Sequence, residues 1–182
     1  WWHHYSPLPV DIAACPCWSV LIVSDSHAQF GNILDYSAAF DLVVGDLSLV
    51  EILREKGVLA EFWPAFSFDP QIYFPLEGIE RDIDIAFVGS FKFHPLRNAL
   101  LYRLSQFSER YSVYLDDQTY GADYNALLNR SNIVVNYSIR REINLRSYEA
   151  TRCGALLFYE DSNLETPLIL PPGLCAVNYH WQ

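Results

Sequence analysis

The second half of the chain alternates short apolar runs with helix-like segments, and this pattern limits the possible folds more than any other feature of the sequence. Apolar runs that are typical of buried strands cover residues 83–88, 111–115, 132–136, 155–159 and 175–179. Helices are predicted between them, over residues 95–107, 124–129 and 146–153. Strands that alternate with helices form a parallel sheet with right-handed crossovers. The sequence therefore predicts an α/β fold.

A shorter version of the same alternation occupies the first half of the chain. Strands are predicted over residues 19–24, 40–44 and 59–63. A helix over residues 47–56 ends at Gly57, and its predicted inward residues are Leu49, Ile52 and Leu53. Between the two halves, residues 64–81 carry three prolines and a glycine among aromatic residues. The sequence therefore predicts two units, residues 1–63 and 82–182, joined by a linker over residues 64–81.

The spacing of side chains also predicts which helix faces are buried. In the segment 95–107 the predicted inward residues are Leu96, Leu100, Leu101 and Leu104. In the segment that ends at Gly154, the residues that share one face are Leu145, Glu149 and Cys153. A carboxylate on an inward face needs hydrogen-bonding partners. Glu149 is therefore the first candidate for a functional residue.

Two interpretations of Glu149 are open at this point. In the functional one, Glu149 accepts hydrogen bonds from hydroxyl groups of a ligand. The ligand's phosphates are then held at the helix start, by the helix dipole and by a capping residue and two cations, which are Asn144, Arg140 and Arg141. In the structural one, Glu149 forms an ion pair with Arg146 or Arg152 on a solvated helix face, which is worth about 0.5 kcal/mol.

The loops that follow the strands of a doubly wound sheet share one edge, and ligands bind at that edge. Polar residues occupy these loops here, at positions 89–90, 116–117, 138–140 and 160–161. Gly89 and Ser90 form a predicted tight turn, which lacks the full GxGxxG pattern. The cations that follow them are near enough to reach a diphosphate laid across Gly89, and a solvated helix start explains them equally well; they are Lys92, His94 and Arg97.

No metal or redox motif stands out from the sequence. Asp116 and Asp117 can contact sugar hydroxyls or a metal, although a turn is the commoner role of such a pair. The segment Cys15-Pro16-Cys17 is one residue short of a redox CxxC motif. Cys153 and Cys175 lie in apolar surroundings, as small core residues do, which favours the reducing cytoplasm. We therefore predict no bound metal and no cofactor.

The charge balance excludes one large class of partners. Acidic residues outnumber basic ones by 22 to 12, and the net charge of −10 is unfavourable for general nucleic-acid binding. Since no apolar run reaches about 18 residues, no membrane span is predicted. The chain begins at Trp1 and contains no methionine, so we expect it to be a fragment or a processed piece.

Three segments of the second half together resemble GT-B glycosyltransferases in order and spacing. They cover residues 85–90 with Arg97, residues 124–136 and residues 145–157. The branch that they are most similar to is the CgeB-like, spore-maturation-protein type. The segment 64–74, which includes Phe68-Asp69-Pro70, looks like the hinge between the two Rossmann-like domains of these enzymes. The resemblance implies Rossmann-like parallel sheets of the GT-B type, with the first domain incomplete.

The resemblance implies a donor site in the second unit. Glu149 would match the family's ribose-binding glutamate, and the loop with Arg97 would meet the donor diphosphate. The donor-binding residues that it implies are Gly89, Ser90, Arg97, Arg146, Ser147 and Glu149. Residues 1–63 would be the C-terminal part of the acceptor-side domain, and residues 82–182 the nucleotide-sugar-binding domain, shortened at its C-terminus.

The implied activity is sugar transfer from a nucleotide-diphospho-sugar to an acceptor, which could be a glycan, a protein or a small molecule. Retaining members often carry a second glutamate where this chain has Arg141, so the stereochemical outcome is open and no catalytic residue is assigned. One alternative is a non-catalytic α/β module that binds the nucleotide without turnover. Another is a signalling domain with Asp116 or Asp117 as phosphoacceptor, which the absence of a matching lysine after a later strand disfavours.

Overall fold

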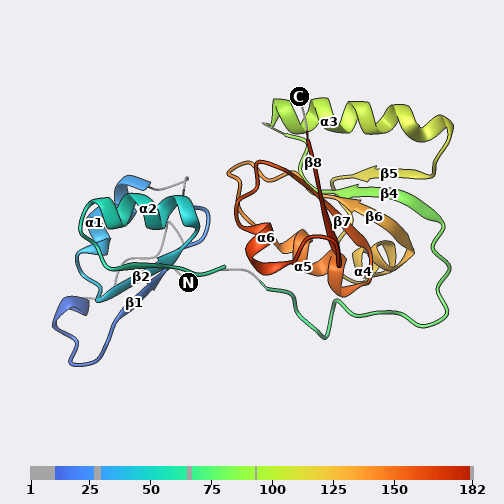
Figure 1. Ribbon diagram of the computed structural model, residues 1–182. Helices are drawn as coiled ribbons and strands as arrows, with labels where there is room; N and C mark the ends of the chain where they lie inside the picture. The colour runs from blue at the N-terminus through green and yellow to red at the C-terminus, as the bar shows by residue number, and fades with distance from the viewer. Residues whose placement is uncertain (1–10, 27–29, 65–66, 93, 181–182) are drawn as a thin grey trace. The chain divides into compact units, whose positions relative to one another are not determined.

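The computed structural model describes residues 11–26, 30–64, 67–92 and 94–180, and the chain divides into two compact units, residues 1–65 and 66–182. The first ten and last two residues, which the predicted units include, lie outside the described residues. Each unit has its own parallel sheet with helices packed beside it (Figure 1). The predicted α/β class with parallel, Rossmann-like sheets is confirmed. No helix in the described ranges is long and apolar enough to cross a membrane.

The first unit is a three-stranded sheet in the order β1-β2-β3. Its elements are the 3₁₀ helix η1 (Ile12–Ala14), β1 (Val20–Ile22), α1 (Phe30–Ser37), β2 (Leu42–Gly45), α2 (Leu47–Glu55) and β3 (Ala60–Phe62). Both helices contribute to one core cluster together with the strands. The Asp46 side chain accepts a hydrogen bond from the Leu49 N–H at 2.9 Å and so caps α2. The helix α1 was not predicted from the sequence.

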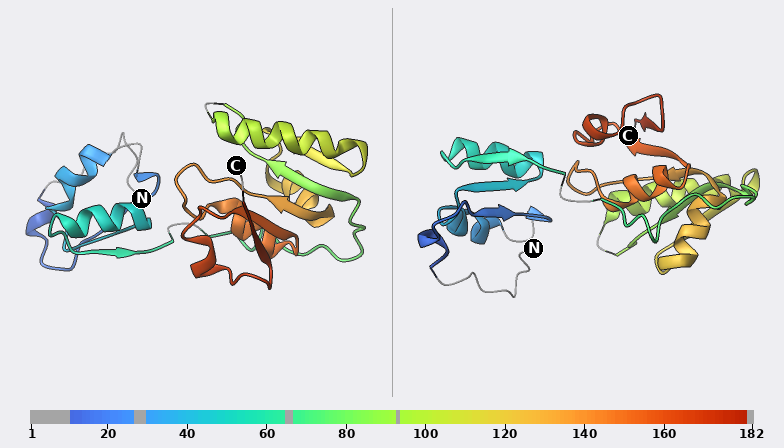
Figure 2. Two further views of the ribbon diagram at one scale, coloured as in Figure 1. Left: turned by 45° about the horizontal axis from the view of Figure 1, so that its top comes forward. Right: turned by 90° about the horizontal axis from the view of Figure 1, so that it is seen from below.

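The second unit is a five-stranded sheet in the order β5-β4-β6-β7-β8, and all paired strands are parallel. Its elements are β4 (Ile83–Val88), α3 (Pro95–Ser105), η3 (Gln106–Glu109), β5 (Val113–Asp116), α4 (Gly121–Arg130), β6 (Ser131–Val135), α5 (Leu145–Arg152), β7 (Leu156–Glu160), α6 (Thr166–Ile169) and β8 (Ala176–Tyr179). The helix α3 lies on one face of the sheet, and α4 and α5 lie on the other (Figures 1 and 2). Gly154 ends α5 with a φ of +79°, as the predicted C-terminal glycine should.

Helical spacing identified α2, α3, α4 and α5, but it did not identify every buried side chain on them. Ile52 and Leu145, which were predicted to face inward, are 37% and 44% exposed. On α3, Leu96 is 63% exposed, whereas Arg97 is buried with Leu100 and Leu101. Leu96 and Arg97 both fit a helical period with Leu100 and Leu101. The hydrogen bonds that Arg97 donates to carbonyls outside the helix favour its burial.

The segment that precedes β4 packs on the second unit. The Asn129 side chain accepts a hydrogen bond from the Leu76 N–H at 2.8 Å and donates one to the Phe74 carbonyl at 3.0 Å. The Tyr73 ring meets the Tyr124 ring edge-on, with 5.9 Å between the ring centroids. The described residues of the predicted linker after position 66 therefore form part of the second unit's surface.

Candidate functional site

The carboxyl ends of β4, β6 and β7 lie side by side, because the three strands are neighbours in the sheet and all run in the same direction. The loops that follow them therefore gather at one edge (Figure 1). The described residues of these loops are 89–92, 94, 136–144 and 161–165. Polar contacts at this edge fix the start of α5.

Asn136 is the centre of a buried hydrogen-bond network at this edge. Its side-chain oxygen accepts hydrogen bonds from Asn144 at 2.9 Å and from the Arg146 guanidinium at 2.7 Å. Its side-chain nitrogen donates to the Ser147 hydroxyl at 3.4 Å, and its carbonyl accepts from the Tyr179 hydroxyl at 2.7 Å. The network ties the start of α5 to the end of β6 and to β8. Because its members come from separate elements, sequence spacing did not reveal it.

Asn144 does not cap α5 as predicted. It occupies the N-cap position with an extended backbone, but its side chain makes no capping hydrogen bond. The bond to Asn136 directs the amide elsewhere. The two upstream arginines do not converge on the helix start in the predicted way either, since Arg141 donates to the Ser162 carbonyl at 2.9 Å and Arg140 is exposed.

Arg146 lies directly against the turn at Gly89. Its guanidinium donates to the Val88 carbonyl from Nε at 2.8 Å and from Nη2 at 2.5 Å. The guanidinium carbon lies 4.4 Å from the centre of the buried Phe87 ring. A side chain at position 89 would place its Cβ 2.1 Å from Arg146 Nη2. The close approach of the guanidinium therefore requires glycine at this position.

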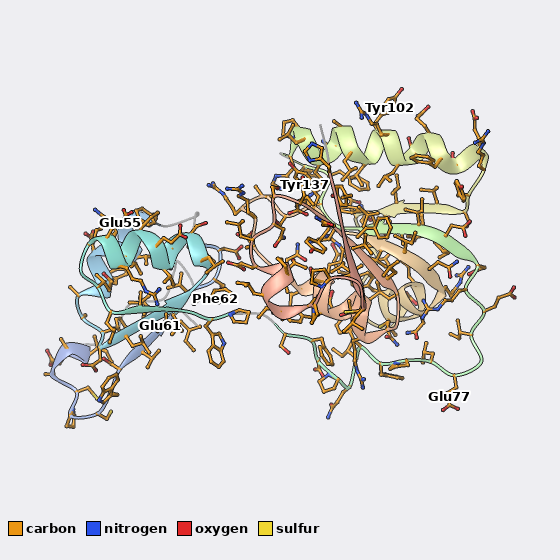
Figure 3. The ribbon with its side chains drawn as sticks, in the orientation of Figure 1. Glu55, Glu61, Phe62, Glu77, Tyr102 and Tyr137 are labelled. Carbon is orange, nitrogen blue, oxygen red and sulfur yellow. The ribbon has the colours of Figure 1, made fainter. Side chains whose placement is uncertain are left out.

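Arg97 approaches the same ring from α3. It is 7% exposed, and its two Nη atoms donate to the carbonyls of Ser90 and Tyr137, each at 3.0 Å. The guanidinium carbon lies 5.9 Å from the Phe87 ring centre. Burial, followed by the charge of Arg146, lowers the pKa of Arg97. Figure 3 shows Tyr137 in the loop near the start of α3.

Neither of these two arginines is neutralised by a direct ion pair. Within the part of the chain that the structure describes, the ion pairs join Arg54 to Glu61, Arg130 to Asp82 and His180 to Asp161. The hydrogen-bond partners of Arg97 and Arg146 are carbonyl and amide oxygens, which carry no net charge. The buried Nε of Arg97 has no hydrogen-bond partner among the described residues. The two guanidinium groups therefore lie behind the half-buried Gly89 and the exposed Ser90 without a direct ion pair, while the charges of Glu160 and Glu142 act on Arg97 from a distance.

Glu149 lies one helical turn beyond Arg146 and is 7% exposed. Burial raises its pKa, while a hydrogen bond with the Tyr73 hydroxyl and the charge of Arg146 lower it. Burial, followed by the charge of Glu149, raises the pKa of Tyr73 to about 12. The alternative of an ion pair on a solvated helix face is wrong, because Glu149 is buried and the Arg152 guanidinium lies 5.5 Å from the centre of the Phe68 ring.

The structure brings most of the predicted donor-site residues together. Contacts join Gly89, Ser90, Arg97, Arg146 and Ser147 around the ends of β4 and β6. Ser147 is fully buried within this group, and its hydroxyl accepts a hydrogen bond from the Asn136 side chain. Glu149 faces Tyr73 instead and is linked to the group through the charge of Arg146.

Glu160 is the residue of this edge whose role the sequence did not reveal. Its Oε1 accepts hydrogen bonds from the Ser138 N–H at 2.9 Å, the Ser138 hydroxyl at 2.5 Å and Asn163 at 3.3 Å. The residue is 2% exposed, and burial raises its pKa. It anchors the loop after β6 to the end of β7. A carboxylate that ends an apolar strand was the signal that could have identified it.

The Asp116–Asp117 pair behaves as a turn. The Asp116 carboxylate accepts hydrogen bonds from the Gln118 N–H at 3.0 Å and from the Thr119 hydroxyl. These bonds lower the pKa of Asp116. In the described ranges, no group of three or more His, Cys, Asp or Glu side chains is arranged to hold a metal ion.

Comparison with protein families gives one match. A family model described as glycosyl transferase-like matches residues 75–177, which is more than half of the chain. No curated protein sequence matches. The matched range runs from the segment before β4 into β8, and so it contains the whole edge described above.

Several solved structures share the fold. The pneumococcal O-GlcNAc transferase GtfA, in complex with UDP and GlcNAc, has a TM-score of 0.58 at 9% identity, over 90% of this chain and 41% of that one. The GtfA/B complex has a TM-score of 0.58 at 10% identity, over 90% and 41%. Sucrose-phosphate synthase from Thermosynechococcus elongatus has a TM-score of 0.54 at 13% identity, over 88% and 51%. These similarities confirm the expected GT-B type of fold, and the chain spans about half or less of each protein.

Proposed function

The chain belongs to the glycosyl transferase-like family, and on that basis we propose that its second unit binds a nucleotide-diphospho-sugar as the donor of a sugar-transfer reaction. The observation that carries this proposal is the pair of arginines without a direct ion pair, held behind the turn of half-buried Gly89 and exposed Ser90. A diphosphate is the part of such a donor that this charge would attract. The acceptor remains a glycan, a protein or a small molecule.

The charge of Arg97 and Arg146 acts through a largely buried setting, where electrostatic interactions are stronger than in water. The start of α5 adds the positive end of its helix dipole at the same edge. A leaving diphosphate gains negative charge as the sugar departs, so fixed positive charge here would stabilise the transition state more than the ground state. The phosphate would contact the exposed turn, with the arginines behind it.

Glu149 is proposed to accept hydrogen bonds from the ribose hydroxyls. A carboxylate is an acceptor-only group when ionised, which suits a pair of neighbouring hydroxyls. The Tyr73 hydroxyl already contacts the Glu149 carboxylate and would orient it. The raised pKa of Glu149 adds a condition, because the carboxylate has to lose its proton before it can accept two hydrogen bonds in this way.

The remaining parts of the proposal rest on the resemblance of the sequence segments. We place the chain in the CgeB-like branch, with residues 82–182 as the donor domain and residues 1–63 as part of the acceptor-side domain. We propose the cytoplasm as its compartment. The pneumococcal neighbour was solved with UDP and GlcNAc, which makes UDP the first nucleotide to try.

The test is calorimetric titration of the chain with UDP and with GDP, each with and without magnesium. We expect one of them to bind without the metal. Glu149→Gln should weaken that binding by about 1.5–3 kcal/mol, the usual worth of a hydrogen bond to a charged group. The matched control is Glu109→Gln, at an exposed position of η3, which should leave the dissociation constant unchanged. A folded chain that binds neither nucleotide would contradict the donor site.

A non-catalytic nucleotide-binding module is the second candidate. The observation that favours it is Arg141, because retaining relatives in the resembled family carry a glutamate at this position. The Arg141 side chain donates a hydrogen bond to the Ser162 carbonyl. Such a module would bind the nucleotide with the same dependence on Glu149. Release of free sugar from a bound nucleotide-sugar separates the two candidates, since only the enzyme cleaves the donor.

A further inference from the structure

The segment Cys15-Pro16-Cys17 places two thiols side by side on the surface of the first unit. It lies between η1 and β1, and both cysteines are free and exposed. Their Sγ atoms are 3.1 Å apart. Cys153 is buried, as the sequence predicted, and Cys175 is half-buried. The chain therefore contains one accessible dithiol, and its two less accessible cysteines are internal controls for reactions of the thiols.

Proline at the middle position explains why the two thiols meet. A residue that precedes proline is restricted to the extended region, and Cys15 has φ −62° and ψ 130°. Proline itself has a nearly fixed φ, and the chain bends at Pro16 and Cys17. The Cys15 N–H also donates to the Ile12 carbonyl at 3.1 Å, which holds the segment against η1. Little conformational entropy remains to be lost when the thiols meet.

The two sulfur atoms have different acidities. The Cys17 backbone N–H and the Cys17 thiol both interact with the Cys15 sulfur and lower the pKa of Cys15, whereas the same thiol interaction raises the pKa of Cys17. Burial raises the pKa of Cys153 to about 11. Since the thiolate is the reactive form, Cys15 is the attacking group of the pair and Cys17 the resolving one.

We propose that Cys15 and Cys17 are a redox modification site that forms a reversible intramolecular disulfide by exchange with a low-molecular-weight disulfide such as oxidised glutathione. The Cys15 thiolate attacks one sulfur of that disulfide, forms a mixed disulfide and releases one thiolate. Cys17 loses its proton to solvent and attacks the Cys15 sulfur, which forms the Cys15–Cys17 bond and releases the second thiolate. The protein gives up two electrons and two protons, and the small disulfide takes up the two electrons. A bridge this exposed is open to reduction by the reverse exchange.

The experiment equilibrates the whole chain with mixtures of reduced and oxidised glutathione, alkylates the remaining thiols and locates them by peptide mass spectrometry. We expect two alkylations to be lost together, at Cys15 and Cys17, with a mass lower by two hydrogens and with Cys153 and Cys175 still alkylated. Reduction should restore both. Because the readout needs no nucleotide, it is independent of the proposed sugar transfer.

Two variants sharpen this test. Cys17→Ser should trap glutathione on Cys15 as a stable mixed disulfide. In Cys15→Ser, Cys17 should react at no more than about one tenth of the wild-type rate, since the lower-pKa thiol is lost. Both positions are exposed, so the fold should persist and can be checked by circular dichroism. If the wild-type chain keeps both thiols alkylatable, or stops at the mixed disulfide, the dithiol site is refuted.

Discussion

Two regions of the second unit that contain buried ionisable side chains differ in what happens to their charge. In the arginine cluster, formed by Arg97 and Arg146 around Phe87, the hydrogen-bond acceptors are uncharged oxygens and the positive charge itself persists. In the glutamate pocket, formed by Glu149, Tyr73 and Cys153, burial raises the pKa of the carboxyl group, so that charge can be removed by a proton. An arginine cannot be neutralised in this way. The cluster is therefore a permanent source of positive potential, whereas the charge of the pocket depends on pH.

This difference matters for the proposed donor. A diphosphate is charged at any pH near neutrality and suits the permanent charge of the arginine cluster. Ribose hydroxyls are neutral, and a carboxylate accepts their hydrogen bonds only once it is ionised. The two parts of a nucleotide-sugar would thus be recognised by groups with different pH dependence.

The largest effect is expected at the turn that the arginine cluster supports. Gly89→Ala forces the Arg146 guanidinium away from the Val88 carbonyl and places a side chain at a φ of +156°. We expect a loss of about 3 kcal/mol in the free energy of unfolding, from the displaced hydrogen bonds and the backbone strain together. Urea denaturation followed by circular dichroism measures it.

Gly121→Ala is the matched control for this change. Gly121 has a φ of +59°, but an added Cβ would meet nothing within 4 Å. Its cost should be the backbone strain alone, about 1 kcal/mol. Equal losses at the two glycines would show that the Arg146 contact contributes nothing to stability.

The next effect concerns the charge of the cluster. Arg97→Met keeps an apolar stem on Phe87 but removes the hydrogen bonds to Ser90 and Tyr137. We expect the free energy of unfolding to fall by about 2 kcal/mol. Affinity for UDP should fall about tenfold or more, while affinity for the nucleoside uridine stays the same, because only the diphosphate feels the lost charge.

The control variant is Arg103→Met, at an exposed position further along α3, which should change neither affinity. Calorimetry with UDP and uridine in parallel measures both variants. If Arg97→Met lowers the affinities for UDP and uridine equally, Arg97 acts through the structure of the loops and not through its charge.

The smallest effect is a change in pH dependence at the glutamate pocket. Burial raises the folded-state pKa of Glu149 above 4.5, so the folded chain holds this proton more tightly than the unfolded chain does. The resulting stabilisation is complete below pH 4.5 and is lost as the pH rises through the folded-state pKa. The Tyr73 hydroxyl lowers this pKa, so Tyr73→Phe should extend the loss to higher pH.

Urea unfolding over a pH series measures this shift, and Glu149→Gln should remove the contribution altogether. Glu160 also has a raised pKa and the same sign of pH dependence, but it is present in every variant and cancels in the differences. Arg152→Ala is the control, because Arg152 packs on Phe68 and not on Glu149. Superimposable curves for the wild type and Tyr73→Phe would show that the Tyr73 hydroxyl does not affect the pKa of Glu149.

Much of the fold was predictable because strands and helices are local. The apolar run of β4 was predicted with the bounds Ile83–Val88 that the structure shows. The closing glycine of α5 and the inward position of Glu149 also followed from spacing along one helix. The helix α1 was missed.

The sequence alone therefore determined the α/β alternation, the parallel sheets and the burial of a carboxylate in α5. Only the tertiary structure decided that Arg97 turns inward, that Asn144 binds Asn136 instead of capping the helix, and that Glu160 anchors a loop. The partners in these contacts lie 7 to 40 residues apart in the chain. Periodicity reports which face of an element is apolar, but the hydrogen-bond partner of a polar group depends on which strand ends the fold brings together.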